Sequence, residues 1–121
     1  MAPRRPMGSL ENDVLACLWA ADHPLVPAEV LDALGDDLAY TTITTILARL
    51  CDKGLVHRRR DGRVFRYGPA VTEEELAAQR MHAQLERTRD RAAALSQFVG
   101  TLSTRDAKAL RAIIDDLDAG S

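Results

Sequence analysis

The chain has 121 residues, of which 46% are apolar and 28% are charged. These values indicate one folded core with a small helical extension and exclude a disordered chain. Aromatic residues make up only 4%, so the core must be mainly aliphatic, which favours a mainly α fold. Apolar runs are short and the N-terminus lacks a secretory pattern, so we expect a cytoplasmic protein with no membrane segment.

The charge is unevenly distributed along the chain. The formal net charge is −2, yet residues 49–67 contain seven basic and two acidic residues, a local charge of +5. One basic face on an otherwise acidic particle attracts a polyanion locally. Double-stranded DNA is therefore the predicted partner.

The N-terminal part is predicted to be an arm followed by a helix. Residues 1–8 contain two prolines and a glycine, and their Arg4 and Arg5 are candidates for a DNA contact. Ser9 is a predicted N-cap for a helix over residues 10–20, which has one apolar stripe.

Two further helices are predicted before residue 54. Pro27 suits the first position of a short helix that Gly35 ends. Residues 40–53 have the apolar spacing of a helix, although four threonines favour a strand, and Gly54 is a natural C-terminal cap. The apolar positions of this third helix are Ile43, Ile46, Leu47 and Leu50.

A β-hairpin is predicted next, with strands over residues 55–60 and 63–68 and a two-residue Asp61-Gly62 turn. With that turn, one face of the hairpin packs inward through Val56, Phe65 and Tyr67. Towards the tip the same face continues with Arg58, Arg60 and Arg63, and the opposite face holds His57, Arg59 and Arg66.

The C-terminal part is predicted to be helical from a capping box at Thr72, with an interruption at residues 87–91 and a last helix from Ser103 to Gly120. Its apolar faces have no place in a three-helix core, so we expect them to pack against a second copy of the chain. The expected dimerisation residues are Leu76, Met81, Leu85, Leu95, Phe98, Val99, Leu110, Ile113, Ile114 and Leu117.

Three helices followed by a basic hairpin are the element order of a winged helix-turn-helix domain, predicted here over residues 9–71 and followed by a dimerisation region over residues 72–121. The third helix would enter the major groove with a face of Tyr40, Thr41, Thr42, Thr44, Thr45 and Arg49. The wing would bind the DNA backbone through Arg58, Arg59, Arg60, Arg63 and Arg66.

No constellation indicates an enzyme. The three histidines are scattered, there is no glycine-rich phosphate loop, and the acids at residues 73–75 are explained by helix capping. Cys17 and Cys51 lie in apolar helical patterns and are expected to be buried reduced thiols. We therefore expect no catalytic residues, no metal and no cofactor.

Four ordered segments resemble the BlaI/MecI/CopY family of transcriptional repressors. They are Asp-Leu-Ala-Tyr-Thr-Thr-Ile at 37–43, Leu-Ala-Arg-Leu at 47–50, Lys-Gly-Leu-Val at 53–56 and Gly-Arg-Val-Phe-Arg-Tyr at 62–67. The resemblance implies a homodimeric winged-helix repressor whose third helices each bind one half of an inverted-repeat operator.

The penicillinase branch of this family implies an inducing step. There a membrane receptor senses a β-lactam and the repressor is cleaved just before a phenylalanine, so the resemblance implies a signalling protease as partner and Gln97-Phe98 as the candidate cleavage bond. Phe98 also fits a dimer contact. The copper branch carries paired C-terminal cysteines, and this chain has none after Cys51, so copper sensing is not expected.

Two other functions are compatible with the residues. One is a winged-helix module whose hairpin docks on an acidic protein, because the fold alone does not determine function. The other is a repressor controlled by a small ligand or by thiol redox chemistry at Cys17 or Cys51.

Overall fold

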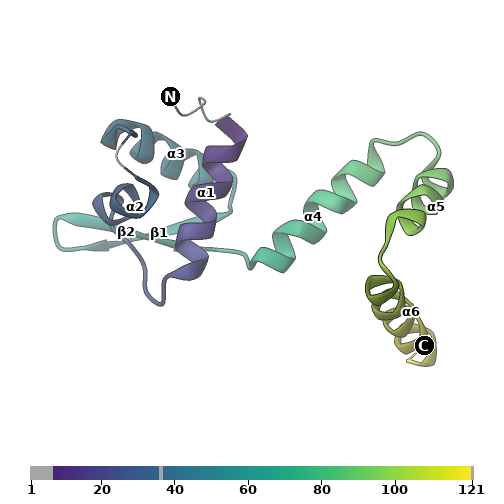
Figure 1. The fold of residues 1–121 in the computed structure, drawn as a ribbon. Coiled ribbons are helices and arrows are strands. Elements are labelled where there is room, and N and C mark those ends of the chain that lie inside the picture. Colours follow the sequence, from purple (N-terminus) through teal and green to yellow (C-terminus); the bar gives the residue numbers. More distant parts are fainter. Residues whose placement is uncertain (1–6, 36, 121) are drawn as a thin grey trace. The chain divides into compact units, whose positions relative to one another are not determined.

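A computed structural model describes residues 7–35 and 37–120, which fold into two compact units, one ending at Ala78 and one beginning at Gln79. Figure 1 shows the chain order of the elements. They are α1 (Met7–Ala20), α2 (Pro27–Leu34), α3 (Tyr40–Asp52), β1 (Val56–Asp61), β2 (Val64–Pro69), α4 (Glu73–Glu86), α5 (Arg91–Thr101) and α6 (Thr104–Ala119). The predicted mainly α fold with three helices and a hairpin wing is confirmed.

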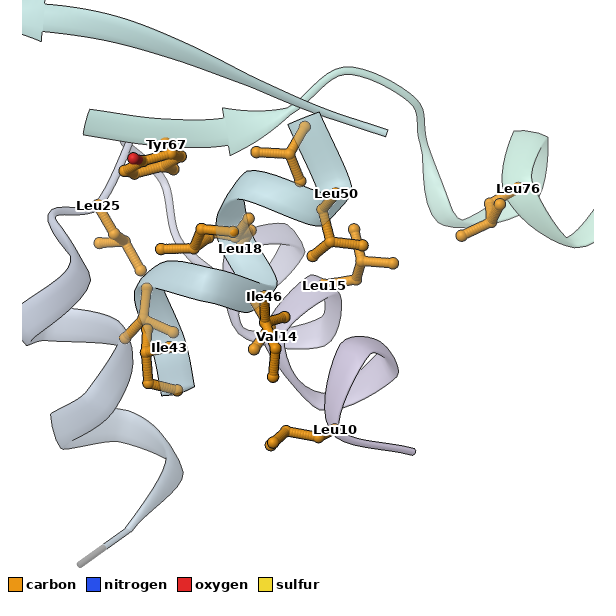
Figure 2. Packing of buried hydrophobic residues seen from close by; sticks show 13 residues of the cluster. Leu10, Val14, Leu15, Leu18, Leu25, Ile43, Ile46, Leu50, Tyr67 and Leu76 are labelled. Carbon is orange, nitrogen blue, oxygen red and sulfur yellow. The ribbon is translucent and has the colours of Figure 1, made fainter. Parts of the chain in front are cut away.

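The core of the first unit lies where α1 crosses α2, α3 and β2. Figure 2 shows the aliphatic side chains of α1 and α3 pointing toward one another, with the Tyr67 ring lying beside them from the hairpin. The buried residues of these two helices are Leu10, Val14, Leu15, Leu18, Ile43, Ile46, Leu47 and Leu50. Burial of one side of α3 confirms the helix predicted from its apolar spacing, although its threonines favour a strand.

The start of α1 differs from the prediction. The helix begins at Met7, so Ser9 lies inside its first turn and is not the N-cap, and residues 7 and 8 do not belong to an arm. Leu10 is only 5% exposed, and its packing stabilises a helical turn on the N-terminal side that the sequence alone does not require. Arg4 and Arg5 lie outside the described residues.

The end of α3 follows the predicted capping. Lys53 is the C-cap, its N–H donates to the Arg49 carbonyl at 3.0 Å, and Gly54 follows with a φ of +76°. A glycine has no Cβ to oppose this left-handed conformation. The N–H of Leu55 then donates to the Leu50 carbonyl at 3.0 Å, so the hairpin starts directly beside the end of α3.

The hairpin loop lies one residue later than predicted. Asp61 pairs with Val64, so the two loop residues are Gly62 and Arg63 instead of Asp61 and Gly62. Gly62 has a φ of +65°, and a glycine at the first loop position is the residue choice of a type II′ turn. Because Arg60 now pairs with Phe65, the register changes by two residues in total, and the other residues keep their predicted faces. Arg63 is the exception, because it lies in the loop and not on the inward face as predicted.

Two contacts hold the hairpin against the helices. Leu25, in the loop before α2, forms a one-residue antiparallel bridge with Tyr67 through hydrogen bonds of 2.9 and 2.7 Å. Trp19 on α1 donates its indole N–H to the Val71 carbonyl at 2.9 Å. The wing is therefore attached to the helical core along β2 and at its C-terminal end.

Leu76 corrects the predicted dimerisation set. It is 5% exposed and belongs to the core cluster of the first unit, so it does not offer a surface to a second chain. Thr72 caps α4 as predicted, because its hydroxyl accepts from the Glu75 N–H at 3.0 Å. This first turn of α4 extends the compact unit to Ala78, past the predicted domain boundary at residue 71.

The second unit contains the end of α4 with α5 and α6. The predicted interruption is present, since α4 ends at Glu86 and α5 begins at Arg91. Asp90 and Ser103 cap α5 and α6 with side-chain hydrogen bonds of 3.0 and 3.1 Å. No residue of α5 or α6 is buried, so these helices have no core of their own. Across the described ranges, no helix is long and apolar enough to cross a membrane.

Leu76→Ala tests its place in the core. Removing this buried side chain is expected to lower the free energy of unfolding by about 2–5 kcal/mol, because the site loses apolar burial and leaves a cavity. Urea denaturation followed by circular dichroism measures the change. Asp32→Ala, at an exposed position of α2, is the control and should change stability by less than about 0.5 kcal/mol. Equal effects would contradict the core position of Leu76.

Candidate nucleic-acid interface

The outward side of α3 is a polar surface with small side chains. Tyr40, Thr41, Thr45, Ala48 and Arg49 are exposed along it. Thr42 and Thr44, also predicted as site residues, are half-buried at its edges. A helix with such a face fits the major groove, because hydroxyls and methyl groups can meet base edges without steric obstruction.

The threonines of α3 differ in what their hydroxyls can do. The Thr44 hydroxyl donates to the Thr41 carbonyl at 3.0 Å, so its proton is already used within the helix. The hydroxyls of Thr41 and Thr45 make no such bond to any residue that the structure describes. Of the predicted set, Thr41 and Thr45 are therefore the exposed threonines that can donate to a ligand.

The two cations near the C-terminal end of α3 differ in whether they have an ion-pair partner. Lys53 donates to the Glu11 carboxylate of α1 at 2.9 and 3.0 Å, which neutralises it and joins the two helices. Arg49 is exposed and has no ion-pair partner within residues 7–35 and 37–120. The free cation on this helix is thus Arg49, at the position where the sequence predicts it.

The inward face of the wing carries two arginines stacked on one aromatic ring. The guanidinium carbons of Arg58 and Arg60 lie 4.3 and 5.8 Å from the centre of the Phe65 ring. The Arg60 Nε–H also donates to the Gly62 carbonyl at 3.2 Å. Cation–π contact restrains these long side chains without neutralising them, so both stay available to an anion.

The outward face and the loop contain the other three arginines. Arg59 and Arg63 are exposed, and the described part of the chain offers neither an acidic partner. Arg66 differs, because its Nε–H donates to the Asp61 carboxylate at 2.8 Å and its Nη1 lies 3.5 Å from Glu29. The hydrogen bond to Asp61, with the charges of Asp61 and Glu29, raises the pKa of Arg66.

The result is a concentration of free positive charge on the first unit. Five arginines that have no acidic partner among the described residues lie on α3 and the wing, namely Arg49, Arg58, Arg59, Arg60 and Arg63. Their mutual repulsion is relieved when phosphates neutralise them and counterions are released. The arrangement can therefore bind a polyanion along the wing while α3 reads its groove.

The ion pairs of Arg66 are the part of the site that sequence reasoning missed. The sequence contains a weak signal for Asp61, because a two-residue turn brings the end of one strand near the start of the next. Glu29 lies far away in the sequence, on helix α2, and no local pattern connects it with the wing. Their effect is to remove one of the five predicted wing cations from the free set.

The two cysteines are free thiols but only half-buried, so the prediction that they are buried is wrong in degree. Burial raises the pKa of the Cys17 thiol and is also the main cause that raises the pKa of Cys51, where the charge of Arg58 acts in the opposite direction. A raised pKa lowers the thiolate fraction on which oxidation depends. No group of three potential metal-ligating side chains occurs among the residues whose positions are described.

The second unit contains the predicted cleavage residues and all of the predicted dimerisation residues except Leu76. Its helices form an apolar groove of about 620 Å³, lined by Met81, Leu85, Leu95, Phe98, Val99 and Leu110 among others. Beyond the groove, Ile113, Ile114 and Leu117 of α6 are 56%, 49% and 69% exposed. The Gln97-Phe98 bond lies inside α5, where Gln97 is exposed and Phe98 is 39% exposed.

Comparisons with known proteins agree with this architecture. The sequence profile of the penicillinase repressor family matches residues 7–116. The transcriptional regulator BlaI of Mycobacterium tuberculosis (strain CDC 1551 / Oshkosh) is 41% identical over an alignment of 125 residues, which covers 99% of this chain and 91% of that protein.

Two solved structures match this chain at lower identity. The BlaI monomer of Bacillus licheniformis, solved with the blaP half-operator, is 28% identical, with a TM-score of 0.47 over 61% of this chain and 88% of that chain. A mutant of MepR from Staphylococcus aureus is 17% identical, with a TM-score of 0.50 over 92% of this chain and 77% of that chain. The latter likeness concerns the fold alone.

The raised thiol pKa values predict slow cysteine chemistry. At pH 7.5 the alkylation of Cys17 and Cys51 by iodoacetamide is expected to be slower in the folded protein than in the urea-unfolded chain. The reason is that a pKa above the ordinary value leaves less thiolate at that pH. Mass spectrometry of timed samples measures both rates. Equal alkylation rates in the folded and unfolded protein would contradict the prediction that folding protects the thiols, and would favour redox control.

Proposed function

The chain belongs to the penicillinase repressor family, and we propose that it is a homodimeric transcriptional repressor that binds an inverted-repeat operator in double-stranded DNA. The observation that carries the proposal is the exposed threonine and arginine face of α3 beside a wing with four unpaired arginines. We place it with the DNA in the cytoplasm and assign it no catalytic step.

Base reading is assigned to α3. Thr41 and Thr45 can donate to base edges or present a methyl group to thymine, and Arg49 can reach a guanine edge or a phosphate. Tyr40, 52% exposed at the start of the helix, is placed at the edge of the groove. Ala48 is small enough to let the helix approach the bases closely.

Backbone binding is assigned to the wing. The four unpaired arginines of the hairpin, Arg58, Arg59, Arg60 and Arg63, lie within a short ribbon that starts directly after α3. Contacts to phosphates position the protein on the duplex without reading its sequence. Affinity is therefore expected to fall steeply as salt increases.

The second unit is assigned to dimerisation. Its helices bury no residue of α5 or α6 within one chain, and short isolated helices are marginal in water. A second copy offers the same apolar face, and a two-fold contact covers both faces at once. Two linked reading helices then bind two half-sites with the effective concentration that a monomer lacks.

Cleavage in the second unit would relieve repression. We propose the Gln97-Phe98 bond, because it lies in an exposed helix of 11 residues whose local unfolding opens the backbone to a protease. Cutting there separates α6 from the rest of the dimerisation region. Intact-mass analysis of the protein from cells treated with a β-lactam tests this step. A fragment ending at Gln97 supports it, and derepression with an uncut chain favours control by a ligand.

Selection of bound genomic fragments tests the function as a whole. The purified protein is mixed with sheared DNA of its source at physiological salt, and the retained fragments are sequenced. Enrichment of an inverted repeat upstream of a gene supports the repressor. The absence of enrichment, together with binding of the purified protein to an acidic protein, would favour the protein-docking alternative.

Thr45→Ala tests base reading by α3. Loss of an exposed hydroxyl and methyl is expected to weaken operator binding by about 1 kcal/mol, because one base contact is lost. Binding to unrelated DNA should not change. Thr44→Ala is the matched control, since its hydroxyl already bonds within the helix. Fluorescence anisotropy with both duplexes measures the effect, and equal losses for the two variants would contradict the assignment.

Ile113→Asp tests dimerisation by α6. A charge on the exposed apolar face is expected to shift the protein to the monomer and to lower operator affinity by about tenfold or more, since the half-sites are no longer bound together. Ala112→Asp introduces the same charge on the opposite side of α6 and is the control. Analytical ultracentrifugation reports the oligomeric state. A dimer that persists in Ile113→Asp would overturn this interface.

A further inference from the structure

We propose that Arg66 is a positioning residue of the wing and not a phosphate ligand. Its guanidinium joins strand β2 to Asp61 at the end of β1 and to Glu29 on α2, and these three residues are called the Arg66 cluster. The inference rests on the proposed function, because its consequence is the placement of the other wing arginines on DNA.

The contacts of Arg66 occupy two sides of its guanidinium. The Nε–H donates to Asp61 Oδ2 at 2.8 Å, and Nη1 lies 3.5 Å from both Glu29 Oε1 and the Pro24 carbonyl oxygen. The same Glu29 oxygen accepts the Val26 N–H at 3.0 Å, at the start of α2. Arg66 therefore links the tip end of β1 to the first turn of a core helix.

The position of the Arg66 cluster suits an orienting role. The neighbouring Tyr67 is bridged to Leu25 by two backbone hydrogen bonds, which fix the base of the hairpin. Asp61 is the last residue of β1, next to the Gly62-Arg63 loop. A contact that reaches from α2 to Asp61 restrains the part of the wing that the backbone bridge does not reach.

Arg59 provides the contrast within the same hairpin. It pairs directly with Arg66 across the strands, so both side chains lie on one face. Arg59 is exposed and lacks an acidic partner in the described ranges, whereas the Arg66 side chain is 37% exposed between two carboxylates. We assign phosphate binding to Arg59 and positioning to Arg66.

Substitution by lysine separates the two roles. Lysine keeps the positive charge and binds phosphate as a point charge, but it cannot reproduce the planar fork that reaches two acceptors. Arg59→Lys is therefore expected to lose less affinity than Arg66→Lys. Arg66→Lys is expected to bind a mixed-sequence DNA duplex about two- to fivefold more weakly, the range for partly exposed ion pairs.

The salt dependence gives a second readout. Arg59→Ala should reduce the slope of log K against log salt concentration by about 0.9, because one phosphate contact is lost. Arg66→Ala should weaken binding and leave this slope unchanged. A residue that only stabilises the fold would alter the thermal midpoint, so all variants are compared where circular dichroism shows them fully folded.

Asp61→Ala gives a test in which the expected sign is opposite for the two roles. Removal of an acid near a phosphate ligand strengthens DNA binding through plain electrostatics, and it would also release Arg66 to bind phosphate. If Arg66 positions the wing, Asp61→Ala instead weakens binding about twofold, within the range for exposed pairs.

The outcomes separate the inference from the proposed function. A larger loss of affinity in Arg66→Lys than in Arg59→Lys supports the positioning role. Wild-type affinity in Arg66→Lys, or stronger binding by Asp61→Ala, would overturn it while the DNA-binding function remains. Failure of the wild-type protein to bind the duplex would overturn the proposed function itself.

Discussion

Burial of one side of α3 is the constraint on which the rest of the first unit depends. Four aliphatic side chains of this helix are each at most 1% exposed, namely Ile43, Ile46, Leu47 and Leu50. If they were exposed to water, the contact that joins α3 to α1 would be lost. Because an aliphatic face must point inward, the threonines and Arg49 must point outward. The short turn at Gly54 then starts the wing beside the end of the same helix. The core thus determines which residues of α3 are exposed.

The basic region is better understood by whether each cation has an acidic partner than by its net charge. Lys53 is paired with Glu11 and Arg66 with Asp61 and Glu29, so both act within the protein. Arg58 and Arg60 are restrained on Phe65 but remain charged. Restraint of a free cation reduces the side-chain entropy lost on binding. Among the described residues, the wing therefore combines four arginines without an acidic partner with one, Arg66, that lies between two carboxylates.

The sequence predicts most of the fold because its strongest signals are local. The apolar period of α3 and the caps at Thr72 and Ser103 depend on neighbouring residues and are confirmed. The loop lies one residue later than the sequence predicts, which moves Arg63 from the inward face into the loop. The other residues keep their predicted faces because the register changes by two. The prediction that Leu76 lies in the dimer contact is wrong, because it is buried in the core of the first unit. An apolar position on a helix does not reveal which partner covers it. The link between Arg66 and Glu29 depends on the tertiary fold, so no local pattern could reveal it.

We propose that the outward face of α3 and the unpaired wing arginines bind one DNA surface. Nuclear magnetic resonance of the ¹⁵N-labelled protein, titrated with a duplex recovered from the genomic selection, tests it most directly. We predict that amide shifts concentrate at Thr41, Thr45 and Arg49 and along residues 58–63. Shifts confined to α2 or to the second unit, with α3 unchanged, would contradict the account.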